Sequence, residues 1–140
     1  MRKLATVLGI ALIFVGIGAF VFWARSSYYA VAQIDLPDGG SIKMLKASVR
    51  STPDCAEFNK AFVEAALKNC PTCTAGPQLC VRLPEPAWVA MREGLPVPES
   101  NYVWVEGGGA ILIEAEPEKA RKLCETMPSQ IPGAHCVKAP

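Results

Sequence analysis

The sequence predicts an α+β fold: a small antiparallel sheet with two helices on one face, braced by disulfides and preceded by one transmembrane helix. Three observations predict it. Residues 4–23 form an uncharged, apolar run at the start of the chain. The six cysteines, an even number, all lie beyond this run. The remaining chain, about a hundred residues long, is close to the commonest domain size and alternates strand-like and helix-like apolar spacing.

The charge balance narrows the classes of function. Lys and Arg number 14 and Asp and Glu number 13. Arg2, Lys3 and Arg25 flank the apolar run, which leaves 11 basic against 13 acidic residues for the rest of the chain. No later window has the concentrated basic surface that neutralises phosphates, so nucleic-acid binding is excluded.

The apolar run predicts a membrane anchor. Twenty residues are about the number that crosses a hydrocarbon core of roughly 30 Å as a helix. Arg2 and Lys3 precede the run and only Arg25 follows it closely, so the positive-inside rule keeps the N-terminus cytoplasmic. We expect residues 1–25 to be a signal-anchor of a single-pass protein of a bacterial inner membrane. The domain then faces the periplasm or the exterior, and residues 4–23 contact the lipid bilayer.

A cleaved signal peptide, with removal of residues 1–32, is the alternative. Ala30-Val31-Ala32 has the small-x-small form of a signal-peptidase site. A signal usually has a shorter apolar region, about 7 to 15 residues, close to its cut site. Here the run is longer and Arg25 intervenes, so the sequence favours the anchor.

A stripe of small residues within the run would let another helix approach closely. Its members are Ala5, Gly9, Gly16 and Ala19, with Leu12 in the same register. Self-association or a membrane partner through this stripe is one alternative. The other, which we prefer, is the Gly and Ala content that transmembrane helices ordinarily have.

The first part of the domain predicts a strand and a helix. Residues 26–40 are expected to be a juxtamembrane linker with an edge strand at 30–36. Residues 41–50 predict a strand with a β-bulge between Met44 and Leu45, where the apolar phase changes. Residues 52–69 predict a helix that Thr52 caps, with Pro53 in its first turn and Pro71 beyond its end. The expected core face of this helix contains Cys55, Phe58, Phe62, Ala65 and Ala66.

Proline and cysteine dominate the stretch at about 70–100, which we expect to be an insertion of loops and turns. A short strand near 79–83 and a helical turn at 87–92 are expected within it. A β-hairpin follows at 102–106 and 110–115, joined by three glycines. Pro117 begins the second helix, and residues 134–138 form the last strand. This order is that of the ferredoxin-like βαββαβ fold, with the extracytoplasmic domain spanning 41–140.

Six cysteines allow 15 pairings. Cys55 and Cys70 would lie about 22 Å apart at opposite ends of one helix, beyond the roughly 7 Å that a disulfide spans. Cys124, on the second helix, and Cys136, on the strand after it, form the preferred pair. The pairing of the other four stays open: Cys55, Cys70, Cys73 and Cys80.

Cysteine chemistry offers one enzymatic alternative. Cys70-Pro71-Thr72-Cys73 has the spacing of a redox dithiol, whose thiolate needs a helix N-terminus or a cation beside it. This motif instead follows a helix, whose negative end raises a thiol pKa, so a structural role is favoured. A metal site is not expected, because His135 and Cys136 are adjacent on a strand and point to opposite faces. No cofactor motif is present.

One sheet face of the hairpin carries an aromatic cluster. Tyr102, Trp104 and Leu112 share this face, and an apolar patch of that kind seldom stays bare. Either the insertion covers it through Trp88, which we favour, or it is a binding surface. We expect a non-enzymatic accessory or interaction protein of the cell envelope. The alternatives are a membrane-tethered thiol–disulfide redox protein using Cys70 and Cys73, and an envelope-glycan-binding module using the aromatic rings.

Overall fold

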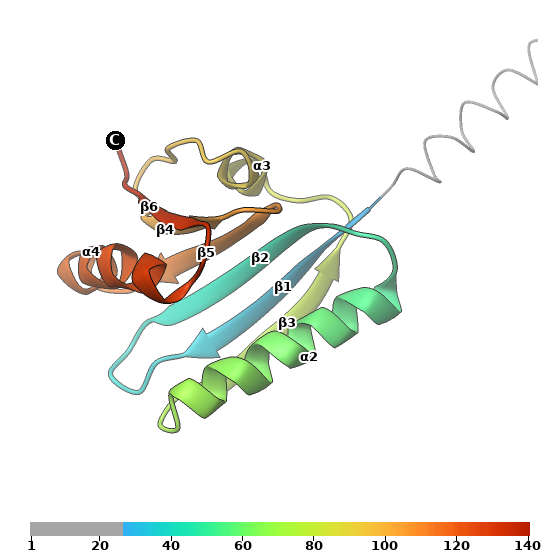
Figure 1. The fold of residues 1–140 in the computed structure, drawn as a ribbon, viewed down its shortest axis with the longest axis horizontal. Helices are drawn as coiled ribbons and strands as arrows, with labels where there is room; N and C mark the ends of the chain where they lie inside the picture. Colours follow the sequence, from blue (N-terminus) through green and yellow to red (C-terminus); the bar gives the residue numbers. More distant parts are fainter. Residues whose placement is uncertain (1–26) are drawn as a thin grey trace, which may run out of the picture.

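The computed structural model describes residues 27–140 (Figure 1). The predicted transmembrane helix and its small-residue stripe lie outside these residues. Within 27–140, no helix has the length and apolar character needed to span a membrane. The elements in chain order are β1 (Tyr28–Asp35), β2 (Ser41–Val49), α2 (Thr52–Asn69), β3 (Thr74–Val81), α3 (Pro86–Arg92), β4 (Tyr102–Val105), β5 (Gly109–Glu114), α4 (Pro117–Thr126), the 3-10 helix η1 (Met127–Gln130) and β6 (Ala134–Val137).

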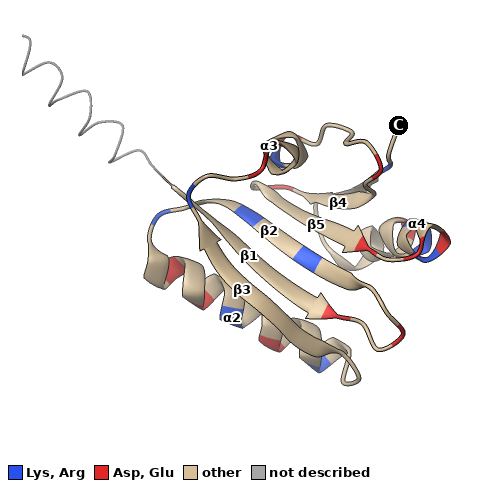
Figure 2. Cartoon of the chain, turned by 180° about the vertical axis from the view of Figure 1, so that it is seen from behind, with Lys and Arg blue, Asp and Glu red and all other residues tan. Residues whose placement is uncertain are grey.

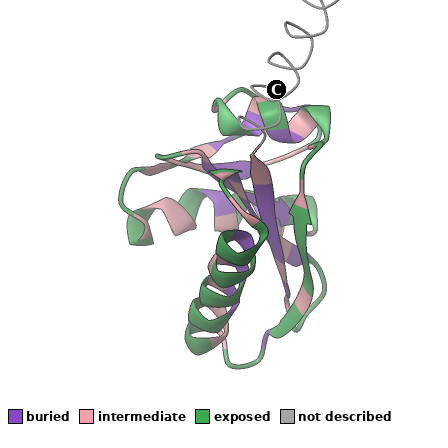
Figure 3. Ribbon diagram, turned by 90° about the vertical axis from the view of Figure 1, so that its right-hand side faces the viewer, coloured by how far each residue is buried: buried purple, intermediate pink, exposed green. Residues whose placement is uncertain are grey.

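A single antiparallel sheet forms the centre of the domain. Its strand order is β3-β1-β2-β5-β4-β6. α2 and α4 pack on one face, and α3 with its flanking loops packs on the other (Figure 1). The outward side of α2 is exposed, whereas β1 behind it is largely buried (Figure 3). The prediction of an antiparallel α+β domain with disulfides is therefore confirmed.

The domain consists of two halves with the same order of elements. β1, β2, α2 and β3 form one half, and β4, β5, α4 and β6 form the other. In each half the first strand lies between the other two, and the halves join through β2 and β5 in the middle of the sheet. Each half also has a disulfide from its helix to its last strand, Cys55–Cys80 and Cys124–Cys136. This duplication of the ββαβ unit was not predicted from the sequence.

The expected βαββαβ order is wrong, because two further strands belong to the sheet. β1 is not an edge strand in a linker: it lies between β2 and β3, and Ala30, Val31 and Ala32 are at most 2% exposed. β3 returns from α2 to pair with β1. The predicted linker and the first part of the insertion thus contribute strands to the sheet.

The apolar phase change in β2 has a different cause from the expected bulge. Pairing between β2 and β5 continues without a break past Met44 and Leu45. Met44 packs on the side of α4, and Leu45 packs on the side of α3. Apolar side chains pack on both faces of β2, so neighbouring residues on opposite faces are both apolar. The irregularity lies further on, where Ser48 has a φ of 61°.

Helix α2 has the predicted bounds and a cap one residue earlier than expected. It runs from Thr52 to Asn69, and the Ser51 hydroxyl accepts a hydrogen bond from the backbone N–H of Asp54 at 3.2 Å. The helical turn predicted in the insertion is α3. The strand predicted near 79–83 begins earlier, and Pro77 lies at an irregularity in its pairing, where a missing N–H disrupts the ladder least.

Candidate functional site

An apolar groove lies between α2 and α4 on the helical face of the sheet. It has a volume of about 460 Å³. Ile34 of β1, Ile42 of β2 and Ile111 of β5 line its floor, and Phe62 of α2 and Leu123 of α4 line its sides. Its position follows from the fold, because α2 packs mainly on β1 and β3 while α4 packs on β5 and β6.

The helical layer over this face of the sheet is incomplete. Strands lie about 4.8 Å apart and a packed helix occupies about 10 Å, so one face of a six-stranded sheet has room for about three helices. On this face the described part of the chain supplies α2, α4 and the short η1. Side chains close most of the remaining gap, because Ile34 and Ile111 on the groove floor are only 2% and 3% exposed.

The lining of the groove contains no charged side chain. Asn69 and Gln130 are its polar members, and both are exposed. A site of this composition offers no acid, base or nucleophile for catalysis, and it suits a neutral, apolar occupant.

The sequence prediction placed the groove side of α2 in the hydrophobic core. Cys55, Asn59 and Val63 are the buried residues of the helix, so the buried face is rotated toward Asn59. Phe62 and Ala65, expected in the core, instead line the groove, and Ala65 is exposed. The side-chain amide nitrogen of Asn59 donates a hydrogen bond to the Leu79 carbonyl at 3.0 Å, whereas its side-chain oxygen is buried without a partner. The strand near Leu79 was predicted, but its place beside α2 was not.

All six cysteines form disulfides. The preferred Cys124–Cys136 pair is present, with the Cα atoms 5.2 Å apart. Cys55 pairs with Cys80 across 25 residues, and Cys70 pairs with Cys73. The Cys70–Cys73 bridge lines one end of the groove, with Cys73 buried and Cys70 half-buried. It follows the C-terminal end of α2, where the helix dipole disfavours a thiolate.

The aromatic cluster of the hairpin lies under α3. Trp88 is 9% exposed and Tyr102 is fully buried, and both belong to one cluster with Leu112. The Tyr102 hydroxyl donates a hydrogen bond to the Leu95 carbonyl at 2.6 Å, and burial raises the pKa of this phenol. Trp104 is half-buried and donates its ring N–H to the Arg92 carbonyl at 3.1 Å. These rings therefore form part of the core and its edge.

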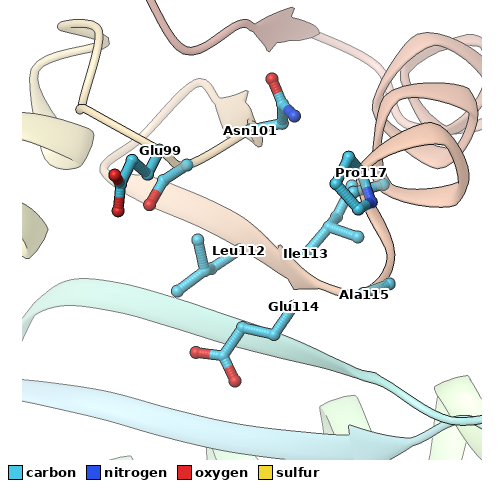
Figure 4. Close-up of a pocket in the computed structure, with 9 residues that line it drawn as sticks. Glu99, Asn101, Leu112, Ile113, Glu114, Ala115 and Pro117 are labelled. Atoms are coloured by element: carbon cyan, nitrogen blue, oxygen red, sulfur yellow. The ribbon is translucent and has the colours of Figure 1, made fainter.

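A second, smaller pocket of about 220 Å³ lies between the loop before β4, strand β5 and the start of α4 (Figure 4). Two of its polar side chains already have partners. Glu114 accepts hydrogen bonds from Ser41 and Lys43, and the Asn101 side-chain oxygen accepts one from the backbone N–H of Ala139. No three metal-ligating side chains gather anywhere in residues 27–140.

One ion pair joins the two halves at the turn between β1 and β2. Lys119, in the first turns of α4, donates a hydrogen bond to the Asp38 carboxylate, and this bond lowers the pKa of Asp38. Asp38 is fully exposed, so solvent screens the pair and its contribution to stability is small.

Comparison of the chain with protein-family models, with curated proteins and with solved structures finds no match.

Proposed function

We propose that this chain is a membrane-anchored, extracytoplasmic interaction protein of the cell envelope, without enzymatic activity, whose groove binds an apolar α-helix of a partner protein. The observation that carries the proposal is the uncharged, apolar groove between α2 and α4, where the helical layer is incomplete. An amphipathic helix that enters such a groove completes the helical layer and buries its own apolar face. The absence of charge from the lining favours an apolar contact surface on that helix.

The cellular location is inferred from the sequence and agrees with the cysteine chemistry. Residues 4–23 have the length of a bilayer span, and the positive-inside rule places the domain on the periplasmic side. Among residues 27–140, no cysteine is free, which suits an oxidising compartment. A tether raises the effective concentration of the groove near other membrane proteins.

Blocking the groove tests the proposal. We expect Ala65→Trp to place an indole in the groove and reduce partner binding at least tenfold, without loss of stability, because Ala65 is exposed. The measurement is cross-linking in intact cells from a photo-reactive amino acid at the position of Gln130. The full-length protein is expected to give one discrete cross-linked product.

Ala56→Trp is the matched control. Ala56 is an exposed alanine of the same helix that does not line the groove. Its substitution should leave the cross-linked product unchanged. Equal cross-linking in the two variants would show that the groove is not the binding site.

A redox protein is the second candidate, because the Cys70–Cys73 bridge lines the groove and would lie beside a bound segment. Its position at a helix C-terminus counts against it. We expect Cys73→Ala, which leaves the half-buried Cys70 free, to trap no disulfide-linked partner on non-reducing gels. A trapped mixed disulfide would favour the redox function instead. Of the rings that the glycan-binding alternative would use, Tyr102 and Trp88 are buried and Trp104 is half-buried, which counts against this alternative.

A further inference from the structure

The end of the sheet where the chain enters the domain has an unusual surface. β1 begins at Tyr28, which pairs with Val49, and the next residue pairs with Val81. Arg50 and Arg82 follow directly after these two partners. The two arginines therefore flank the start of β1, where Figure 2 shows blue bands beside the grey trace. Leu83 comes next and is 88% exposed.

We propose that this end of the domain, formed by Tyr28, Arg50, Arg82 and Leu83, docks on the phospholipid surface with Leu83 inserted among the headgroups. The inference rests on the proposed membrane anchor and adds an orientation to it. If residues 4–23 cross the bilayer, the four residues 24–27 reach at most about 14 Å. The start of β1 is then the part of the domain closest to the lipid.

Leu83 is the first reason to assign this end to the lipid. Its exposed fraction is the largest among the bulky apolar side chains that the structure describes; the next, Leu95, is 53% exposed. An apolar side chain gains favourable burial when it enters the boundary between headgroups and acyl chains. Beside a membrane anchor, the lipid interface can bury this exposed leucine side chain.

The neighbouring side chains supply the second reason. The Arg82 guanidinium donates a hydrogen bond to the Tyr28 hydroxyl at 2.7 Å and lies 4.8 Å from the centre of that ring. Tyrosine suits the membrane–water interface, and arginine binds phosphate in a bidentate manner. Within residues 27–140, neither Arg50 nor Arg82 forms a salt bridge. No carboxylate of the described residues pairs with either charge, so lipid phosphates can bind both.

Two acidic residues lie near this end in the sequence. Asp54 is in the first turn of α2, where a negative charge faces the positive end of the helix dipole. Glu85 lines a pocket with Lys43 and Trp88 on the α3 face of the sheet. The attraction to lipid therefore depends on Leu83 and on local phosphate contacts more than on net charge.

This orientation determines how far the groove lies from the membrane surface. α2 begins next to Arg50 and has 18 residues, so it extends roughly 27 Å from the docked end. The groove residues of α2, Phe62 to Asn69, lie in the second half of the helix, so the groove lies in the part of the domain farther from the docked end. A partner helix that continues upward from the bilayer would reach the groove only beyond the first half of α2.

Depth measurement on the full-length protein in phosphatidylcholine–phosphatidylglycerol vesicles tests the proposal. Leu83→Cys adds one reactive thiol to a domain whose cysteines are all paired. We expect an environment-sensitive fluorophore on this thiol to be quenched by lipids that carry a quencher in the headgroup region. Ala75→Cys, exposed on β3 about 20 Å from the end of the same strand, is the matched control and should not be quenched.

The outcomes separate docking from anchoring. Alkaline extraction of the same vesicles reports whether the chain is anchored at all. Retention of the protein with equal, weak quenching at both positions would overturn the docking and leave the anchor intact. Extraction of the protein would overturn the anchor, and the docking with it. The double variant Arg50→Ala/Arg82→Ala is expected to reduce quenching at position 83 severalfold, and unchanged quenching would remove the arginines from the docking surface.

Discussion

Replacing Trp88 by alanine is expected to lower the free energy of unfolding by about 3–4 kcal/mol. The indole is 9% exposed and packs with Tyr102 and Met91, which are 0% and 1% exposed. Truncation leaves a cavity between α3 and the sheet that close-packed neighbours cannot fill. The measurement is urea unfolding followed by far-UV circular dichroism, which does not depend on the removed fluorophore.

Val89→Ala is the control for Trp88→Ala. Val89 is the next residue of α3 and is 40% exposed. Its truncation should change the free energy of unfolding by no more than about 0.5 kcal/mol, as surface substitutions usually do. A loss below about 1 kcal/mol for Trp88→Ala would mean that α3 is not a layer of the core.

Removing the disulfides one at a time should give an ordered series of losses. Chain-entropy estimates are about 3.5 kcal/mol for the Cys55–Cys80 bridge, about 3 for Cys124–Cys136 and about 2 for Cys70–Cys73. The order follows the sequence separations, which are 25, 12 and 3 residues. Each bridge is removed by a double replacement with alanine, and unfolding is measured as for Trp88→Ala.

The Cys55–Cys80 bridge also holds strand β3 in place. Cys80 lies on β3, an edge strand whose side chains are mostly exposed, so little apolar burial holds that strand in place. Without Cys55–Cys80, β3 is expected to become the first site of cleavage in limited proteolysis. If Cys70/Cys73 replacement proved the most destabilising of the three, the entropic account of these bridges would be wrong.

The structural features that were predicted correctly are those with a local signal in the sequence. Pro53 and Pro71 mark the start and end of α2, whose bounds agree with the prediction. The three glycines after Glu106 predict the β4–β5 hairpin. The Cys124–Cys136 bridge was predicted because a helix and the strand that follows it are close in space whenever they pack together. Each of these inferences depends on residues near one another in the chain.

The candidate site was not predicted, because the residues that form it are distant from one another in the chain. A strand next to a hydrophobic segment has the same apolar pattern whether it lies at the edge or in the middle of a sheet, so the central place of β1 was missed. Asn59 was not expected in the core, because its hydrogen-bond acceptor, the Leu79 carbonyl, lies on a strand 20 residues away. The rotation of α2 that buries Asn59 also turns Phe62 toward the groove.

The sequence by itself therefore determined the type of domain, the bounds of its main helix and hairpin, and one of its three disulfides, because local spacing and turn residues dictate such features. Only the tertiary structure decided that the domain is a doubled ββαβ unit and that an apolar groove remains between α2 and α4. These features depend on which strands pair, and pairing is a choice among distant segments with similar apolar patterns.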